Sequence, residues 1–291
     1  MIQDINKAER GEKLSKLVDL ELKSKNIFIG KSHYYGSKRV FGGRVLCQAL
    51  AAASKTVSDR SVHSLHAYFL RPGNPKLPIE YEVEISRDGG SFSSRRIKAS
   101  QKNKTLLNMS ASFHLNESGK EHQSLMPDVD HYEDLINLEE LSKRDIFKNL
   151  PDNYFKFMID NFPFEIRPVS PSDIISRNPV EPIRQVWIKH KDKISSLQDI
   201  HTCLLSYLSD FFLLGTANLP YAVLSNNLKL QMASLDHSIW FHRPCRVDKW
   251  LLYSMESPNL SSSRGFSTGQ FFDNEGALIA SVAQEGLIRF I

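Results

Sequence analysis

The stretch GGRVLCQALAAAS (Gly42–Ser54) predicts a helix that opens on two glycines and is rich in alanine. Alanine favours helix and carries a very small side chain, so the flanks of this helix are narrow. A β-sheet can wrap closely around a narrow helix. We therefore expect the neighbouring segments of the chain to form that sheet.

From Ser61 onward the pattern changes to that of strands. Apolar and polar residues alternate over short segments, and turns rich in Pro, Gly and Asn separate them. The predicted strands are SVHSLHAYFL, PIEYEVEIS, SFSSRRIKASQ and TLLNMSASFHL. One helix followed by an antiparallel meander predicts a unit of the α+β class. Before this unit, residues 7–20 predict a short amphipathic helix.

The same order returns in the second half of the chain. IRQVWIKHK (183–191) alternates as a strand does, and SLQDIHTCLLSYLSDFFLL (196–214) has apolar residues at helical spacing. Four further predicted strands follow, NLKLQMASLDHSIWF, KWLLYSMES, SRGFSTGQFFD and ALIASVAQEGLIRF. Asp273-Asn274-Glu275-Gly276 is predicted to form a hairpin turn between the last two.

The two halves also share short sequence motifs. YFLRP (68–72) resembles WFHRP (240–244) at a displacement of 172 positions, and SSR (93–95) resembles SSR (262–264) at 169. Two landmarks within one repeated order indicate an internal duplication. The predicted division is residues 1–115 and 161–291 for the two units. Residues 116–160 form a polar connector with one helical stretch, LINLEELSKRDIF.

Composition limits the function classes. The chain has 291 residues, of which 41% are hydrophobic and 24% charged, as in globular proteins. The net charge of +4 favours an anionic small molecule but is too weak to predict nucleic-acid binding. Three widely spaced cysteines predict reduced, packed side chains rather than a metal site, and no metal or cofactor is expected.

Targeting signals are not predicted either. The start, MIQDINKAERGEKL, lacks the apolar core of a signal peptide. No run reaches the roughly 18 apolar residues of a membrane span. The final residues, Arg289-Phe290-Ile291, are not a peroxisomal address of the Ser-Lys-Leu type. We therefore expect a cytoplasmic protein without a membrane span.

A helix wrapped by an antiparallel sheet and duplicated in one chain resembles the double-hotdog architecture, in which the two sheets join as one. A series of motifs narrows the resemblance to the acyl-CoA thioesterase II (TesB-type) family. In chain order they are FGGRVLCQALAAA, SLHAYFLRPG, GGSFSSRRIKASQ, FEIRPV, EPIRQVWIK, YLSDF, LDHSIWFHRP, SSSRGF and VAQEG. This resemblance implies hydrolysis of fatty acyl-CoA to free fatty acid and CoA, without a cofactor. It also implies a homo-oligomer, a dimer or a tetramer.

The resemblance also implies a site made of an aspartate, a hydroxyl and an amide that together activate a water. They fall on Asp210 in YLSDF, on Ser234 in ASLDHS, where bacterial members often have threonine, and on Gln284 in VAQEG. Each residue type has a structural alternative. An aspartate can face water on a helix surface, a strand serine can bond the backbone, and a glutamine can bond across strands.

The segment SLDHSIWFHRP (234–244) crowds a serine, an aspartate and two histidines together. Side chains alternate between the faces of a regular strand, so His237 is expected to point away from Ser234. That geometry argues against a serine–histidine pair. Asp236 is expected on the face of Ser234, as a partner of the site or in an ion pair with Arg243. His237 and His242 are expected to be half-buried packing residues.

The implied chemistry suits these residue types. A thioester carbonyl is already electrophilic, so Asp210 would accept a proton from water while Ser234 and Gln284 hold that water. The developing oxyanion needs N–H donors, and the amides at the start of a glycine-rich helix, such as Gly42 and Gly43, can supply them. The sequence leaves open which helix does so. Direct attack by Asp210 to form an anhydride is the less favoured route.

Candidates for the phosphates of CoA are basic residues of the strand motifs, although structural pairing explains each of them equally well. They are Arg71, Arg95, Arg96 and Arg264. Two other functions remain as alternatives. One is a hotdog hydratase or dehydratase, which would need a catalytic His–Asp pairing. The other is a non-catalytic acyl-CoA-binding protein, which would not need all three polar residues.

Overall fold

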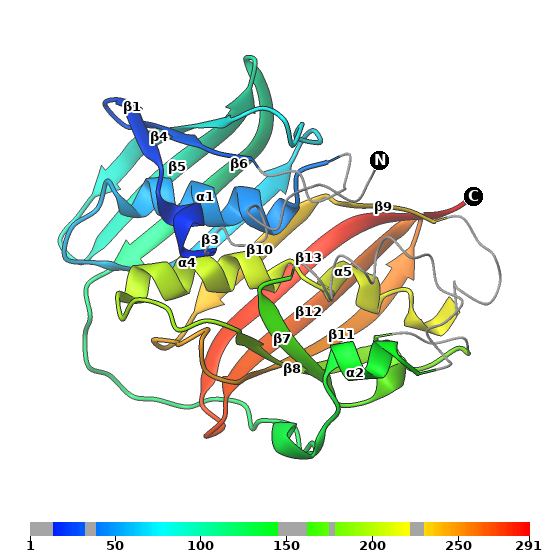
Figure 1. The fold of residues 1–291 in the computed structure, drawn as a ribbon. Helices are drawn as coiled ribbons and strands as arrows, with labels where there is room; N and C mark the ends of the chain where they lie inside the picture. The colour runs from blue at the N-terminus through cyan, green and yellow to red at the C-terminus, as the bar shows by residue number, and fades with distance from the viewer. Residues whose placement is uncertain (1–13, 33–38, 145–161, 175–177, 222–229) are drawn as a thin grey trace.

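The computed structural model describes residues 14–32, 39–144, 162–174, 178–221 and 230–291 (Figure 1). The described elements of the first half are η2 (Leu14–Val18), β1 (Glu21–Ser24), β2 (Ile27–Gly30), α1 (Gly42–Ser54), β3 (Ser61–Phe69), β4 (Ile79–Asp88), β5 (Phe92–Gln101) and β6 (Lys104–His114). The predicted helix at 42–54 and the four strands after it are thus confirmed. Of the helix predicted at 7–20, residues 7–13 lie outside the described part, and Leu14–Val18 is a 3-10 turn.

The second half repeats this order after a connector. Between the halves lie η3 (Tyr132–Asp134) and the short helix α2 (Leu138–Ser142). The later elements are β7 (Phe164–Pro168), η5 (Pro171–Asp173), β8 (Ile183–His190), α4 (Gln198–Ser209), α5 (Leu213–Thr216), η6 (Leu219–Tyr221), β9 (Leu230–Ser234), β10 (Asp236–Phe241), β11 (Leu251–Ser261), β12 (Arg264–Asp273) and β13 (Leu278–Phe290). The predicted turn at 273–276 is confirmed, with Gly276 at a φ of 88°. The division at residues 115 and 161 stays a prediction.

All described strands belong to one antiparallel sheet. Its order is β1-β2-β4-β5-β6-β3-β10-β13-β12-β11-β8-β7, with β9 paired to β13 off this path. The order reads the same from either edge if each strand of one half is exchanged for its counterpart in the other. This is the double hotdog predicted from the sequence, with its two sheets joined as one.

The joint between the halves is the pairing of β3 with β10. His66 lies opposite Ser238, and these two residues are 172 positions apart. The axis of the duplication therefore passes between them, which confirms the landmark YFLRP/WFHRP. The second landmark was wrong. Arg95 lies within β5, whereas Ser262 and Ser263 form the turn before β12 with φ values of 49° and 58°.

Strand registers identify the true counterparts. Leu65 pairs with Ala111, which in turn pairs with Arg95 on β5. In the second half Gln284 takes the place of Ala111 and pairs with Ser267 on β12. Arg95 therefore corresponds to Ser267.

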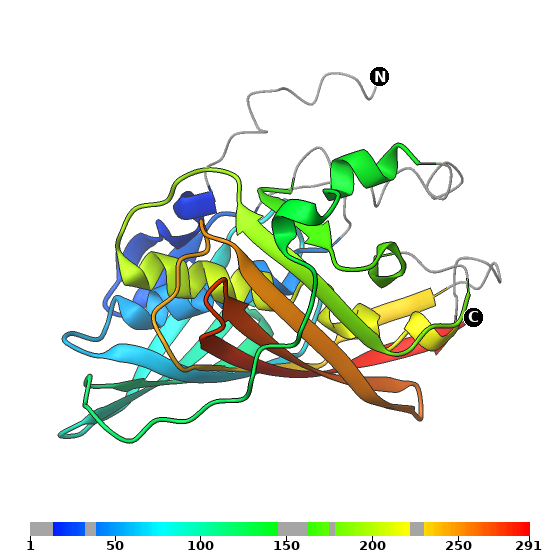
Figure 2. The ribbon, with the colours of Figure 1, turned by 90° about the horizontal axis from the view of Figure 1, so that it is seen from below.

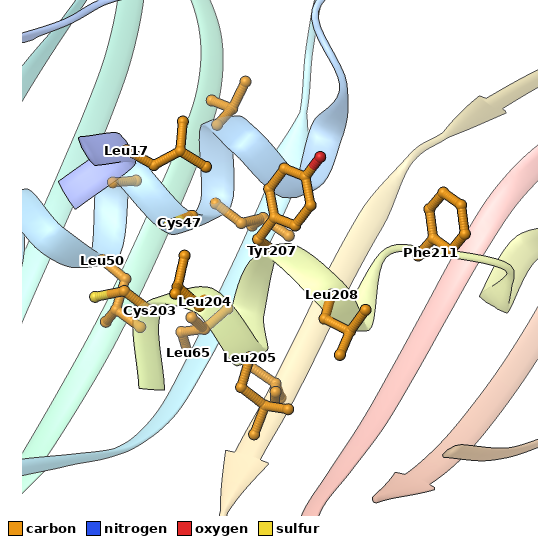
Figure 3. Packing of buried hydrophobic residues seen from close by; sticks show 14 of the residues in the cluster. Leu17, Cys47, Leu50, Leu65, Cys203, Leu204, Leu205, Tyr207, Leu208 and Phe211 are labelled. Carbon is orange, nitrogen blue, oxygen red and sulfur yellow. The ribbon is translucent and has the colours of Figure 1, made fainter. Parts of the chain in front are cut away.

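Helices α1 and α4 lie side by side on one face of the sheet, as Figures 1 and 2 show. Every residue of α1 from Gly43 to Ala53 is buried, which its small side chains allow. Residues of α1, α4 and β3 form the core between the helices and the sheet. Figure 3 labels Leu17, Cys47, Leu50, Leu65, Cys203, Leu204, Leu205, Tyr207, Leu208 and Phe211.

The segment that holds α4 is strongly apolar. Within the described residues, Gln198–Tyr221 is long and apolar enough to cross a membrane by length and composition alone. However, 72% of its most apolar window is buried inside the fold. This is the pattern of a core helix, and the segment is divided into α4, α5 and η6.

The connector crosses the opposite face of the second half. Its residues Met126, Val129, Tyr132 and Leu135 pack on an outer cluster centred on Trp187 and Trp250. The Trp187 indole donates to the carbonyl of Asp130 at 3.0 Å. The helical stretch predicted at 135–147 is shorter in the structure, where α2 ends at Ser142, and residues 145–161 lie outside the described part.

Candidate active site

Helix α4 ends where the sequence pattern predicts that it continues. The apolar spacing predicts one helix over 196–214, but α4 stops at Ser209 and Asp210 is its C-cap. Phe212 has a φ of 67°, in the left-handed region that a bulky residue rarely adopts. The buried Arg184 supports this turn, because its Nη1 donates to the Phe212 carbonyl at 2.9 Å and its guanidinium lies 5.2 Å from the ring.

The Asp210 carboxylate accepts hydrogen bonds from three directions. Gln284 Nε2 donates to Oδ1 at 2.6 Å, and Ser234 Oγ donates to the same oxygen at 3.3 Å. The backbone N–H of Gly43 donates to Oδ2 at 2.8 Å. The structure thus brings the three predicted site residues together and adds a fourth group, the first turn of α1.

These contacts set the protonation of the site. Burial raises the pKa of Asp210 from 3.8 to about 6, and the hydrogen bonds from Gln284, Gly43 and Ser234 oppose this rise. A carboxyl with a pKa close to neutrality is ionised at pH 7 yet remains basic enough to accept a proton. The arrangement therefore suits a general base.

The two glycines permit the close approach of α1 and α4. A Cβ atom at Gly42 would lie 2.7 Å from Asp210 Oδ2, and one at Gly43 would lie 2.3 Å from the backbone oxygen of Tyr207. No side chain fits at such distances. The glycine pair was expected to leave helix amides free for an oxyanion. The structure shows that the start of α1 lies at Asp210 and that the Gly43 amide binds the carboxylate.

A β-bulge next to Ser234 changes the expected side-chain directions. Ser234 pairs with Gly286 and Ser238 with Ala283, so the strand containing Leu235 carries one more residue than β13 over this interval. Such an insertion shifts the alternation of faces. Ser234 and His237 therefore both face the end of α4, and the prediction that His237 points away from Ser234 was wrong.

His237 and Asp236 have other partners than those expected. His237 is fully buried rather than half-buried, and its Nε2 lies 2.8 Å from Ser209 Oγ. Burial lowers the pKa of His237 to about 3, so the ring is neutral. Asp236 accepts from the backbone N–H of Glu285 at 2.7 Å, on the other side of the bulge. Its expected pairing with Arg243 is wrong, because Arg243 binds Glu121 at 3.1 Å.

Of the arginines considered for CoA, one has a clear structural role. Arg95 is buried, donates to Thr56 Oγ1 at 2.9 Å and forms an ion pair with Asp88 at 2.9 Å. Arg264 pairs with Glu285 at 3.0 Å on the exposed face. Arg71 donates to the carbonyl of Thr105 at 3.0 Å.

Sequence reasoning missed the bond of the Gly43 amide to Asp210 and the contact between Ser209 and His237. The glycine pair at the helix start was a visible signal for the first of these. For the second, the strand alternation pointed in the wrong direction, because the bulge depends on pairing with β13.

Comparisons with known proteins agree with this architecture. Residues 157–287 match the family described as "Acyl-CoA thioesterase", and residues 32–114 match the "Acyl-CoA thioesterase N-terminal domain". Acyl-coenzyme A thioesterase 8 of Homo sapiens is 40% identical over 281 residues, covering 94% of this chain and 88% of the human protein. Acyl-CoA thioesterase 2 of Haemophilus influenzae is 39% identical over 279 residues, covering 96% and 95%.

A solved structure is similar over the same length. Acyl-CoA thioesterase II TesB2 from Mycobacterium marinum superposes with a TM-score of 0.79 at 36% identity. The alignment covers 96% of this chain and 99% of the mycobacterial chain. The similarity therefore includes both halves and the joint between them.

Proposed function

The chain belongs to the acyl-CoA thioesterase family, and on that premise we propose that Asp210 is the general base of thioester hydrolysis. The enzyme cleaves an acyl-CoA into the free acid and CoA. Its substrate is a thioester, and water is the second reactant.

In the proposed reaction, Asp210 accepts a proton from water as the water oxygen bonds to the thioester carbon. The carbonyl electrons move to oxygen and form a tetrahedral oxyanion. The oxyanion then reforms the carbonyl and breaks the C–S bond. The departing CoA sulfur takes the proton back from Asp210, so the enzyme returns to its starting state.

Ser234 and Gln284 act beside the base. Both donate to Oδ1 of Asp210, at 3.3 Å and 2.6 Å, so each holds the carboxylate in one orientation. The Gln284 amide has a second N–H that can bind the attacking water or the carbonyl oxygen. The start of α1 is the positive end of a helix dipole, and it favours both the carboxylate and the oxyanion.

The observation that supports this proposal best is the state of Asp210. Its carboxylate is held by Gln284, Gly43 and Ser234, and its pKa is raised to about 6. Carboxyl groups whose pKa is raised toward neutrality are concentrated at functional sites. The Asp236–His237 pair gives no such support to the hydratase alternative, since the His237 ring is buried against Ser209 and Asp236 binds the backbone of Glu285.

Thiol release from acyl-CoAs of increasing chain length tests the proposal. Asp210→Asn should lower kcat by about 10³-fold and Gln284→Ala by about 10²-fold, with folding retained. Asp199→Asn at the exposed start of α4 and Gln270→Ala on β12 are matched controls that should behave as the parent. Turnover of Asp210→Asn close to that of the parent would refute the role of Asp210.

We also propose that the chain forms a homo-oligomer through the outer face of its central strands. Tyr68 on β3 and Trp240 on β10 are 66% and 39% exposed there. Large exposed aromatic side chains are common at interfaces. Light scattering on the parent and on Tyr68→Glu tests this. A monomeric parent would contradict it.

A further inference from the structure

A row of three buried side chains crosses the sheet beside Asp210. Ser267 on β12 lies opposite Gln284 on β13, and both are fully buried. On the other side of Gln284, the pairing of Ser238 with Ala283 brings His237 on β10 next to it. All three side chains face the end of α4, since Gln284 binds Asp210 and His237 binds Ser209.

Each member of the row has one polar atom without a hydrogen-bond partner among the described residues. These atoms are Ser267 Oγ, Gln284 Oε1 and His237 Nδ1. Buried polar atoms are nearly always paired in proteins, so three adjacent exceptions need an explanation. Their position beside the proposed base points to the reaction rather than to folding.

The counterpart row in the first half is built differently. Its members are Leu65, Ala111 and Arg95. There the long side chain of Arg95 extends to Thr56 and Asp88 and is held by both. The second half has the short hydroxyl of Ser267 at the position of Arg95. The two halves thus share this backbone position, but one has a structural arginine there and the other a small donor that faces an amide.

The donors and acceptors in this row of side chains determine which hydrogen bond Ser267 can make. Ser209 Oγ donates to the Ser206 carbonyl at 3.0 Å, so the His237 Nε2 bonded to it carries the ring proton. His237 Nδ1 is then an acceptor, as is Gln284 Oε1. The Ser267 hydroxyl is therefore the one donor in the row that can serve the amide oxygen.

We propose that Ser267 is a positioning residue that donates to Gln284 Oε1 through one water and keeps Nε2 turned toward Asp210. The two ends of a glutamine amide have nearly the same shape, so only hydrogen bonds decide its orientation. A flipped amide would present its oxygen to the Asp210 carboxylate. Both groups are hydrogen-bond acceptors, so the bond between them would be lost. This inference rests on the proposed function, since it assigns Ser267 a role through Gln284 and Asp210.

The effect of losing Ser267 can be read from the acidic limb of the pH profile of kcat. The hydrogen bond from Gln284 lowers the pKa of Asp210, so an amide that no longer points at the carboxylate lets that pKa rise. The groups that bind Asp210 are neutral and do not titrate in this range. They are Gly43 on α1, Ser234 on β9 and Gln284 on β13. His237 on β10 and Tyr253 on β11 are neutral between about pH 4.5 and pH 8, because burial lowers the first pKa and raises the second.

The experiment compares Ser267→Ala, Gln284→Ala and the double variant by thiol release across this pH range. Ser267→Ala should lower kcat by about tenfold with KM unchanged and move the acidic limb to higher pH. The double variant should lose no more than Gln284→Ala alone, because both changes remove the same interaction. Ser267→Thr keeps the hydroxyl and should restore the position of the limb. Thr268→Ala, on the outer face of the same strand, is the control and should match the parent.

Two outcomes would overturn the inference. One is a Ser267→Ala enzyme with the acidic limb of the parent. The other is a loss in the double variant equal to the product of the two single losses. If Asp210→Asn and Gln284→Ala are impaired in either case, the proposed function stands and only the role of Ser267 falls. Full activity of Asp210→Asn would instead refute the proposed function itself.

Discussion

Replacing Asp210 by asparagine removes a carboxyl group whose burial raises its pKa from 3.8 to about 6. Between these two values the folded protein binds a proton at Asp210 that the unfolded chain has released. The free energy of unfolding of the parent therefore falls as pH rises through this window. The asparagine variant has no such proton, so its stability relative to the parent should rise from about pH 4 to about pH 7 and then level off.

The size of this change follows from the pKa. A rise from 3.8 to about 6 corresponds to about 3 kcal/mol at most. Asp210 is only partly buried as a whole residue, and solvent screening reduces the effect, so we expect about 1–2 kcal/mol. Asparagine also loses the contact with the Gly43 amide. That loss does not depend on pH and therefore does not alter the slope.

Urea unfolding of the parent and of Asp210→Asn at a series of pH values measures this difference. Asp248→Asn is the control. Arg246 lowers the pKa of Asp248 to about 2, so its contribution to stability is lost only as pH falls through the range between 3.8 and that value. The Asp248→Asn difference should accordingly stay level where the Asp210→Asn difference rises. A level or falling difference for Asp210→Asn would refute the reasoning, because it would mean that ionising Asp210 costs the fold nothing.

Two further substitutions test the geometry of the site. Gly43→Ala would place a Cβ atom 2.3 Å from the backbone oxygen of Tyr207, so the start of α1 must move and kcat should fall by about 10²-fold, whereas Gly90→Ala, with nothing within 4 Å of its Cβ, should match the parent. Ser234→Thr keeps the hydroxyl and should retain kcat within several-fold of the parent. Ser234→Ala should lose about tenfold, less than Gln284→Ala, because its bond to the carboxylate is 3.3 Å long against 2.6 Å. The reverse order of losses in a thiol-release assay would contradict this ranking.

Much of the fold could be predicted because it depends on local pattern. The helix at Gly42–Ser54 matches the structure at both ends. The four strands after it follow from alternation and turn residues. The joint between halves could be predicted from YFLRP and WFHRP, because these segments lie on the two strands that pair.

Two features could not be predicted, because each depends on distant residues. Helix α4 ends at Ser209 because Phe212 adopts a left-handed conformation, and Arg184 on the distant strand β8 supports that conformation. The bulge at Leu235 arises from pairing with β13. The match of SSR to SSR was misleading, since a short polar motif recurs in a turn as readily as in a strand.

The sequence predicted the three side chains of the candidate site but not the backbone contact that completes it. The resemblance to a family named Asp210, Ser234 and Gln284, and the structure brings them within hydrogen-bond distance. The Gly43 amide was expected to serve the oxyanion, and its bond to Asp210 depends on a contact between the two halves of the chain. The place of Ser267 opposite Gln284 depends on strand register, which no local pattern in the sequence specifies.

The hydrogen bond from Gly43 to Asp210 joins groups 167 residues apart, one from each half of the chain. During translation the first half leaves the ribosome well before β10, and at typical synthesis rates the interval is roughly 10–30 s. Throughout that time β3 is an unpaired sheet edge, the kind of surface that other chains can join. Pairing with β10 therefore protects this edge of the nascent chain as well as joining the two halves.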